Sequence, residues 1–230
     1  MISPQVTPEG GVRIYENDPT QGPACAIACG AGTIYRNYFV NLDGQTGQTA
    51  NKQIDCLADL GAALGNCNGK LWKMQNGYAL PSFEGLEEVH ARLSSMSEAQ
   101  LDELRSLLRV GVHSDVQVTI DDCKHTETQV YCSALPVAYS HHSTELWQPF
   151  AKLILEAAYE ATFCTAAINA TRSENNRLFL TLLGGGAFGN SEDWIISAIS
   201  RSLALLQDAD LDVRIVSFRR SNPNVRRLVT

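Results

Sequence analysis

The chain has 230 residues, of which 44% are hydrophobic and 19% charged, and its formal net charge is −7 at pH 7. This composition predicts a folded chain with a sizeable core and excludes an intrinsically disordered one. The acidic balance argues against a nucleic-acid partner, which would need a basic face on the protein. It still allows a small phosphate ligand, because backbone amides can bind phosphate without any lysine.

The sequence shows no sign of a membrane span or a secretion signal. No apolar run reaches the roughly 18 residues that suggest a transmembrane helix. Residues 1–5 lack the charged and apolar regions of a signal peptide. The seven cysteines are an odd number for a disulfide framework, and several lie within apolar runs, as reduced core cysteines do. We therefore expect a cytoplasmic protein without a membrane partner.

The first part of the chain gives irregular signals. Residues 1–20 are rich in proline and glycine, which predicts an irregular segment with at most an edge strand at 11–15. Two short strands are expected next, one in the apolar run 24–28 and one in the β-branched and aromatic run 33–40. A polar, glycine-bearing loop at 41–49 follows them.

Stronger local signals begin after this loop. Apolar residues recur with a helical period through 51–64, and Gly65 closes the predicted helix. The pair Asn76-Gly77 lies between the predicted strands 71–75 and 78–80, and it is the strongest short-range signal for a β-hairpin.

The rest of the chain alternates between helices and strands. Helices are predicted at 86–93, 97–110 (with Ser97 as N-cap), 147–170 and 191–206. Strands are predicted at 116–120, 129–134, 178–183 and 213–218. The strand 178–183 is continuously apolar, as strands buried on both faces of a sheet are. The pattern predicts one α/β domain over residues 1–230, a three-layer α/β/α sandwich with a mixed central sheet.

The most informative motif is a glycine-rich loop between a predicted strand and a predicted helix. It consists of Gly184, Gly185, Gly186, Ala187, Phe188, Gly189 and Asn190. Glycines let the chain turn sharply and let a ligand approach the backbone closely, while the next helix offers unpaired N–H groups at its N-terminus. These parts predict a phosphate site at the carboxyl end of a strand. The alternative is a strand-to-helix turn that uses glycine for geometry alone.

This loop, GGGAFGN at 184–190, resembles the glycine loop of macrodomains and poly(ADP-ribose) glycohydrolases, in which a Gly-x-Phe-Gly turn wraps the diphosphate of ADP-ribose. The strand region 130–139 fits the order of elements in that family. Further segments are similar to the MavL-type macrodomain branch of ADP-ribosylhydrolases: TQGPACAIA at 20–28 with YRNY at 35–38, QTANKQIDCL at 48–57, and WKMQNGY at 72–78.

The resemblance covers about residues 20–220 and implies a macrodomain-like fold. It also implies that residues 184–190 bind ADP-ribose and that the chain removes ADP-ribose from a modified protein side chain, arginine being the favoured one. The partner would be ADP-ribose or an ADP-ribosylated protein, with no cofactor. Relatives are expected to carry an additional segment ahead of residues 6–9. The alternative function is a reader module that binds ADP-ribose without cleaving it.

Cleavage of an ADP-ribosyl bond passes through an oxocarbenium-like transition state and needs a carboxylate that activates water or stabilises the ribose. The resemblance points to the polar loop and the following helix, so the candidates are Asp43 and Asp55. Asn41 and Asn51 in the same region either orient ribose hydroxyls or cap the helix. Asp59, four residues after Asp55 on one face of the predicted helix, is more simply a solvated surface charge.

Other candidate groups carry weaker signals. Asp121-Asp122 forms either an acid pair or a turn. The five histidines show no metal-binding spacing, so no metal site is expected. Cys132 is either a nucleophile, in a hydrolase of unrelated substrates, or a buried strand cysteine. Phe188 is the aromatic residue best placed to stack on a ligand, since it lies within the glycine loop.

Overall fold

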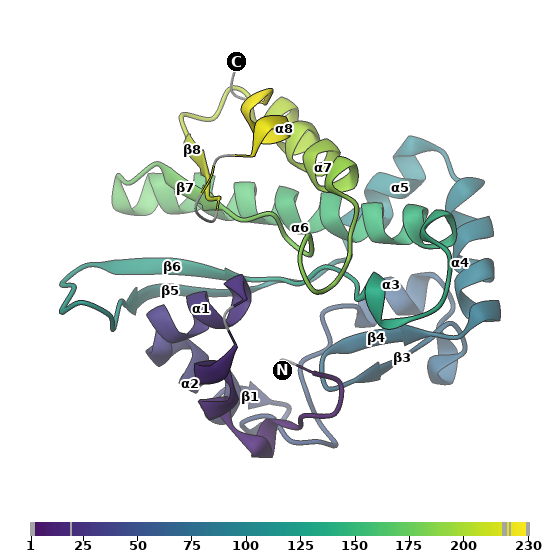
Figure 1. Ribbon diagram of the computed structural model, residues 1–230, viewed down its shortest axis with the longest axis horizontal. Coiled ribbons are helices and arrows are strands. Elements are labelled where there is room, and N and C mark those ends of the chain that lie inside the picture. The colour runs from purple at the N-terminus through teal and green to yellow at the C-terminus, as the bar shows by residue number, and fades with distance from the viewer. Residues whose placement is uncertain (1–2, 19, 218–219, 221, 229–230) are drawn as a thin grey trace. The chain divides into compact units, whose positions relative to one another are not determined.

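The computed structural model describes residues 3–18, 20–217, 220 and 222–228 (Figure 1), apart from the side chain of Gln21. Helices and strands are mixed along the chain, as expected for an α/β protein. The chain divides into two compact units. Unit 1 comprises Met1–Cys56, Lys73–Leu80 and Gly111–Tyr131, and unit 2 comprises Leu57–Trp72, Pro81–Val110 and Cys132–Thr230.

Unit 1 combines short helices with three hairpins. Its 3-10 helices are η1 (Pro8–Gly10) and η2 (Val12–Asn17), and its α-helices are α1 (Gln21–Ala28) and α2 (Gly30–Tyr38). Its strands are β1 (Asn41–Leu42), β2 (Gln45–Thr46), β3 (Trp72–Gln75), β4 (Tyr78–Pro81), β5 (Gly111–Gln117) and β6 (Thr126–Tyr131). The first residue of β3 and the last residue of β4 belong to unit 2.

The strands predicted at 11–15, 24–28 and 33–40 are wrong, because these residues are helical. Short apolar runs do not separate strand from helix by periodicity, and the alanines of α1 favour a helix. In α2 the inner face is polar: Thr33 Oγ1 donates to the carbonyl of Ala26 at 2.9 Å, and Asn37 Nδ2 donates to the carbonyl of Pro8 at 3.1 Å. The aromatic residues that suggested a strand point outward, and Tyr35 is 51% exposed.

The predicted helix at 51–64 begins only at α3 (Ala58–Ala63), in unit 2. Side-chain amides bind the backbone of the preceding segment in place of helical hydrogen bonds. Gln48 Oε1 accepts from the N–H of Ile54 at 3.0 Å, and Gln45 Nε2 donates to the carbonyl of Lys52 at 3.3 Å. Such local competition disfavours a helix. The expected closure by Gly65 is confirmed, since its φ is +72°.

The hairpin predicted around Asn76-Gly77 is confirmed, with β3 and β4 paired and both turn residues at positive φ (47° and 84°). The strands predicted at 116–120 and 129–134 overlap β5 and β6, but each observed strand begins and ends earlier in the chain than the predicted one. These two strands pair antiparallel from Gly111↔Tyr131 to Gln117↔Thr126, with an irregularity between His113 and Val116. Their hairpin contributes Val116 and Val118 to a small core with Cys29.

Unit 2 is mainly helical. Its helices are α3, η3 (Cys67–Gly69), α4 (Phe83–Ser94), α5 (Glu98–Arg105), η4 (Val137–Tyr139), α6 (Thr144–Ser173), α7 (Glu192–Leu205) and α8 (Pro223–Arg226), and its strands are β7 (Arg177–Leu180) and β8 (Asp212–Ile215). The predicted helices at 86–93, 97–110, 147–170 and 191–206 are confirmed, although the second ends earlier. Ser97 caps α5 with a capping box, whereas Ser191 makes no side-chain capping bond to α7.

The core of unit 2 is built around α6, the longest helix in Figure 1, and α4, α5 and α7 pack against it. Trp147, Phe150 and Phe163 of α6 are almost completely buried. Trp72 packs its ring 5.0 Å from that of Phe150. Burial of these large side chains is the main stabilising term in this unit.

The described strands pair as four two-stranded sheets, and these pairings do not join into one central sheet. The pair β7–β8 is parallel, with α7 as the connection between its strands. The expectation that 178–183 is buried on both faces is wrong, because the exposure of β7 alternates and Phe179 is 57% exposed. The predicted strand 213–218 ends at Ile215, and residues 218–219 lie outside the described part of the chain.

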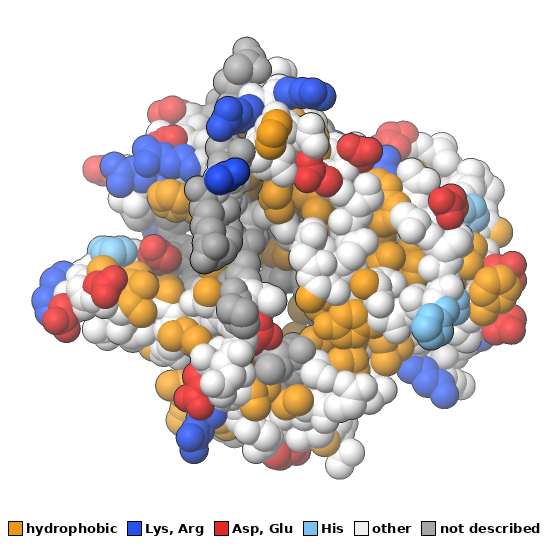
Figure 2. All heavy atoms as spheres, viewed as in Figure 1, with side chains coloured by type: hydrophobic (Ala, Val, Ile, Leu, Met, Phe, Trp, Pro, Cys, Tyr) orange, Lys and Arg blue, Asp and Glu red, His pale blue; other side chains and the backbone are white. Residues whose placement is uncertain are grey.

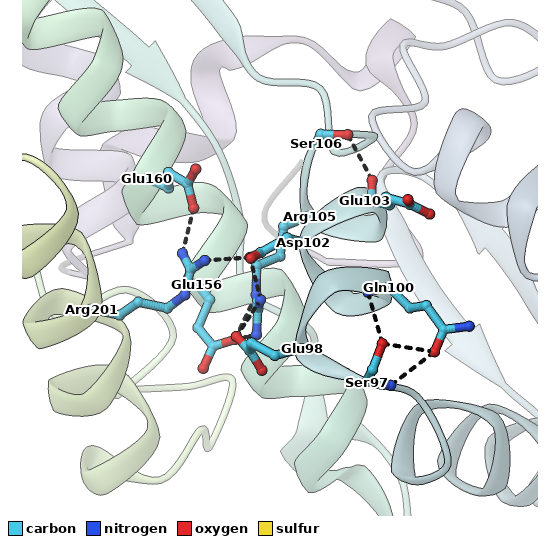
Figure 3. Close-up of polar contacts among 10 residues, drawn as sticks. All are labelled: Ser97, Glu98, Gln100, Asp102, Glu103, Arg105, Ser106, Glu156, Glu160 and Arg201. Atoms are coloured by element: carbon cyan, nitrogen blue, oxygen red, sulfur yellow. Dashed lines mark hydrogen bonds and ion pairs between the residues drawn. The ribbon is translucent and has the colours of Figure 1, made fainter.

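An ion-pair network joins three helices of unit 2 (Figure 3). Arg105 of α5 is 7% exposed and binds Glu156 of α6 through Nε at 2.9 Å and Nη2 at 2.8 Å. Its Nη1 binds Glu98 and Asp102 at 2.7 and 2.6 Å. Arg201 of α7 binds the same Asp102 at 2.5 Å and also pairs with Glu160 of α6.

Hydrophobic side chains reach the surface among charged ones, as Figure 2 shows, and Phe39 and Ile168 are 58% and 68% exposed. Within the described ranges, no helix has both the length and the apolar character to cross a membrane.

All seven cysteines are free, but only Cys29 is buried, so the expectation of several core cysteines is wrong.

Candidate functional site

The glycine loop leaves β7 and makes two consecutive turns before α7. The N–H of Gly185 donates to the carbonyl of Leu182 at 3.2 Å, and the N–H of Gly189 donates to that of Gly186 at 3.0 Å. Gly184 and Gly189 have φ values of +75° and +69°, which explains why glycine occupies these positions. The loop therefore has a defined shape.

Asn190 fastens the base of the loop and does not face solvent. It is 5% exposed; its N–H donates to the carbonyl of Gly184 at 3.0 Å, and its Nδ2 donates to the carbonyl of Leu135 at 2.8 Å. Its Oδ1 is buried without a hydrogen-bond partner among the described residues. A Cβ on Gly184 would overlap Ala134 and would lie 2.7 Å from Asn190 Nδ2. Asn190 thus positions the loop, a different role from the predicted direct contact with ligand.

The tip of the loop is open. Gly185, Gly186 and Ala187 are exposed, and a Cβ on Gly186 would have no atom within 4 Å. Within the described part of the chain, the N–H groups of Gly186 and Ala187 have no hydrogen-bond acceptor. Exposed backbone N–H groups in a turn are typical of a site for an anion.

Two aromatic residues support the loop from neighbouring elements. Tyr159 of α6 is 3% exposed; its hydroxyl donates to the carbonyl of Thr181 at 2.7 Å and accepts from the N–H of Leu183 at 2.9 Å. Burial raises the pKa of Tyr159, so the hydroxyl stays protonated as this bonding requires. Phe188 packs its ring edge-on against Tyr139, with ring centroids 5.5 Å apart.

Unit 1 contains a pocket of about 340 Å³ that is lined by two of the predicted site residues, Asn51 and Asp55. The segment 50–55 without Lys52, the β3–β4 hairpin at 74–77 and Thr7 line it. The lining is rich in amides, since Gln53, Gln75 and Asn76 join Asn51, and Asp55 is the charged residue among them. Asp55 is half-buried and lies outside any helix.

Asp43 and Asn41 have a different environment in unit 1. Asp43 has φ +46° and, with Gly44, turns the chain between β1 and β2. Its side chain is 98% exposed and lies 3.9 Å from Lys52 Nζ. Asn41 Oδ1 accepts from the N–H of Gly44 at 3.1 Å, so Asn41 caps the turn. Of the two candidate carboxylates, Asp55 is the one that lines a pocket.

The expected pairing of Asp55 with Asp59 on one helix face is wrong, because only Asp59 lies in α3. Asp59 forms a two-pronged ion pair with Arg109, at 2.6 and 2.7 Å, in unit 2. Asp121 and Asp122 both have positive φ, 52° and 51°, in the loop between β5 and β6, which matches the turn interpretation.

The other candidate groups are dispersed. No group of three or more His, Cys, Asp or Glu side chains in the described ranges could hold a metal ion. Cys132 is half-buried directly after β6. Burial and the nearby Glu127 raise the pKa of Cys29 to about 11, so this thiol is a poor nucleophile at neutral pH.

Several residues of these two regions had no signal in the sequence that linked them to the site. Tyr159 and Gln53 act through partners far away in the chain, and neither belongs to a motif. Asn76 was predicted only as a turn residue, although its Oδ1 also accepts from Gln53 Nε2 at 2.9 Å.

In comparisons with known proteins, no family model, no curated protein and no solved structure matches this chain.

Proposed function

We propose that this chain hydrolyses the bond between ADP-ribose and a modified protein side chain, with arginine as the favoured linkage. The observation that carries the proposal is the open tip of the glycine loop, where the N–H groups of Gly186 and Ala187 have no acceptor among the described residues. These amides would bind the diphosphate, because N–H groups fixed in a turn bind an anion without prior rearrangement.

The resemblance assigns the chemistry at the ribose to Asp55 and Asn51, and the proposal keeps this assignment. A carboxylate in a pocket can activate water or stabilise the developing positive charge, and an amide can orient the ribose hydroxyls. Asp43, which is almost fully exposed, is the second candidate for the carboxylate. The proposal needs no cofactor, and it places the reaction in a cytoplasmic compartment, as the odd number of cysteines indicates.

Arginine is the favoured linkage because of the chemistry of the pocket. A guanidinium group carries only donors, and it pairs best with carboxylate and amide oxygens. The pocket lining offers the carboxylate of Asp55 and several side-chain amides, and no lysine or arginine is among its described lining residues. A positively charged leaving group would therefore meet no repulsion there.

The proposal takes from the macrodomain-type three-layer sandwich only its building unit, a parallel strand pair joined by a helix, because the described strands form four separate pairs and no mixed central sheet. The parallel pair β7–β8 with α7 as its crossover supports it, because parallel strands joined by a helix are the unit from which such sheets are built.

Calorimetric titration with ADP-ribose, AMP and NAD tests the binding step. The expected result is tight binding of ADP-ribose and weak binding of the other two. Equal weakness for all three would contradict the proposal.

Release of ADP-ribose from an ADP-ribosylated arginine peptide tests the chemistry. Asp55→Ala should lose turnover and keep its affinity for ADP-ribose, whereas Asp43→Ala should keep both if Asp55 is the essential carboxylate. A parent protein that binds ADP-ribose without releasing it would instead be a reader module. Loss of activity on alkylation of Cys132 would point to a cysteine-dependent hydrolase.

A further inference from the structure

One wall of the pocket of unit 1 is formed by a short segment that precedes η1 and includes its first two residues. Residues 3–9, which we call the N-terminal strap, run along it and contribute Thr7 to its lining. Pro4 and Pro8 are buried and anchor the strap on either side of Thr7. Among the described residues, the backbone-to-backbone hydrogen bonds of the strap are local turns, such as those from the N–H of Gly10 to the carbonyl of Thr7 and from the N–H of Gly11 to the carbonyl of Pro8, both 3.0 Å.

Side chains hold the strap in place. The carbonyl of Pro4 accepts from Gln75 Nε2 at 2.9 Å and from Asn76 Nδ2 at 2.6 Å. At the other end, Glu9 Oε1 accepts from the N–H of Ala50 at 2.8 Å, and this bond lowers the pKa of Glu9. A segment fixed by a few side-chain bonds opens more readily than one that belongs to a sheet.

Asn76 connects the strap to a second wall of the pocket. Its Nδ2 binds Pro4, while its Oδ1 accepts from Gln53 Nε2 at 2.9 Å, and Gln53 also lines the pocket. One amide side chain therefore fixes two walls at once, from a tight turn whose backbone is itself well defined.

We propose that the N-terminal strap is a gate over this pocket, and that Gln75 and Asn76 are the positioning residues that hold it shut. Release of the Pro4 carbonyl frees Thr7 to leave the lining and opens the pocket to larger ligands. The inference concerns access to the pocket and goes beyond the proposed function, because it does not depend on which ligand enters.

Asn76→Asp tests the gate. The substitution keeps the positive φ, which aspartate tolerates, and keeps an acceptor for Gln53, but it replaces the donor to Pro4 with a carboxylate oxygen. Asn68→Asp is the matched control: Asn68 also precedes a glycine and has φ +55°, but it lies in η3 of unit 2. Both variants gain one negative charge.

Two ligand-free measurements follow the gate. Amide exchange at Gly10 and Gly11 should be about three- to tenfold faster in Asn76→Asp, the effect of losing one hydrogen bond. The amide of Ala50, whose N–H donates to Glu9 Oε1 at the far end of the strap, should also exchange faster than in the parent. The Asn68→Asp control should match the parent in both.

Glu9→Ala provides a second variant at an exposed position, which removes one of the two bonds at the opposite end of the strap and leaves the bond from Asn37 Nδ2 to the carbonyl of Pro8 in place. It should accelerate exchange of the same two glycine amides. Unchanged exchange at Gly10 and Gly11 in both variants would overturn the gate, and so would faster exchange at these two amides in Asn76→Asp without faster exchange at Ala50. Failure to bind ADP-ribose would count against the proposed function alone, since neither measurement uses that ligand.

Discussion

Gly184 and Gly186 occupy the same loop under different constraints. Gly184 has φ +75°, and a side chain there would overlap Ala134, whereas Gly186 has free space around the position of a Cβ. The first glycine is thus required by the fold. The second has no such requirement, so a functional reason for glycine at this position would be the close approach of a ligand to the backbone.

Substitution by alanine separates these two roles. Gly184→Ala should destabilise the protein by about 1–3 kcal/mol, the usual cost of a side chain in a strained backbone conformation. Gly186→Ala should keep the melting temperature of the parent and weaken ADP-ribose binding. Thermal unfolding and calorimetric titration of both variants check this. Full ADP-ribose affinity in Gly186→Ala would remove the loop tip from the proposed site.

Glu192 links two helices through a bond that depends on pH. Its carboxylate, in the first turn of α7, accepts from Asn224 Nδ2 at 2.5 Å and Asn222 Nδ2 at 2.9 Å, and these bonds lower the pKa of Glu192. A carboxyl whose pKa is lowered on folding stabilises the fold above its unfolded pKa, about 4.3 for glutamate, and this contribution is lost as the pH falls through the folded pKa.

Acidification below about pH 4.3 should therefore loosen α8. The measurement is amide exchange at Arg226, whose N–H donates to the carbonyl of Asn222 at 3.1 Å. Glu192→Gln is the control, because glutamine keeps an acceptor but does not titrate. The same acid response in parent and variant would show that another group is responsible.

At the scale of elements, the network of α5, α6 and α7 has one buried centre. Glu156 is 7% exposed, and the guanidinium of Arg105 binds it through two nitrogens. Burial disfavours the charged form of Arg105, but its bonds to Glu98, Glu156 and Asp102 outweigh this and raise its pKa. Arg105 therefore stays charged, and it is the buried partner that Glu156 depends on.

Removal of the arginine should be costly. Arg105→Met leaves Glu156 buried and unpaired and is expected to destabilise the protein by about 3–5 kcal/mol. Arg109→Met, which breaks only the exposed pair with Asp59, should cost about 0–1 kcal/mol. Chemical denaturation of the two variants measures the difference. Equal losses would mean that the buried pair contributes no more than a surface pair.

The elements predicted correctly from sequence are those with a local physical signal. Asn76-Gly77 favours positive φ at both turn residues, and Ser97 with Gln100 forms the capping box of α5. The runs 24–28 and 33–40 lacked such a signal, and the helices they form are stabilised by contacts such as that of Asn37 with Pro8. At 33–40 a propensity for a strand was overridden by such tertiary contacts, whereas at 24–28 the alanines themselves favour a helix.

The candidate site could be predicted only where its residues are close in the sequence. The glycine loop was found because a strand, its glycines and a helix follow one another directly. The pocket was not found, since it brings Thr7, Asn51 and Asn76 together from separate segments. The expected helix through Asp55 failed because Gln48 binds the backbone of that segment.

On the scale of the whole molecule, the two units differ in the size of their cores. Unit 1 has a small cluster of Cys29, Val116 and Val118, whereas unit 2 buries the large side chains of α6. Since burial of apolar surface dominates stability, unit 1 should open at a lower free energy than unit 2.

Native-state amide exchange tests this difference. Amides of the β5–β6 ladder should exchange through openings of lower free energy than amides in the middle of α6. The rate at which a thiol reagent modifies Cys29 gives an independent measurement, since this buried thiol reacts only when unit 1 opens. Identical opening free energies in the two units would show that the chain unfolds in a single step.

The order of the units along the chain has a consequence for synthesis on the ribosome. The last residue of unit 1 is Tyr131, and every residue of α6 comes later. Nascent chains emerge from the N-terminus, so all three segments of unit 1 leave the exit tunnel before the helix that organises unit 2 is complete. Residues 57–72 and 81–110 then lack the helix α6, which completes the core of unit 2. We therefore expect chaperones to bind this part of the nascent chain.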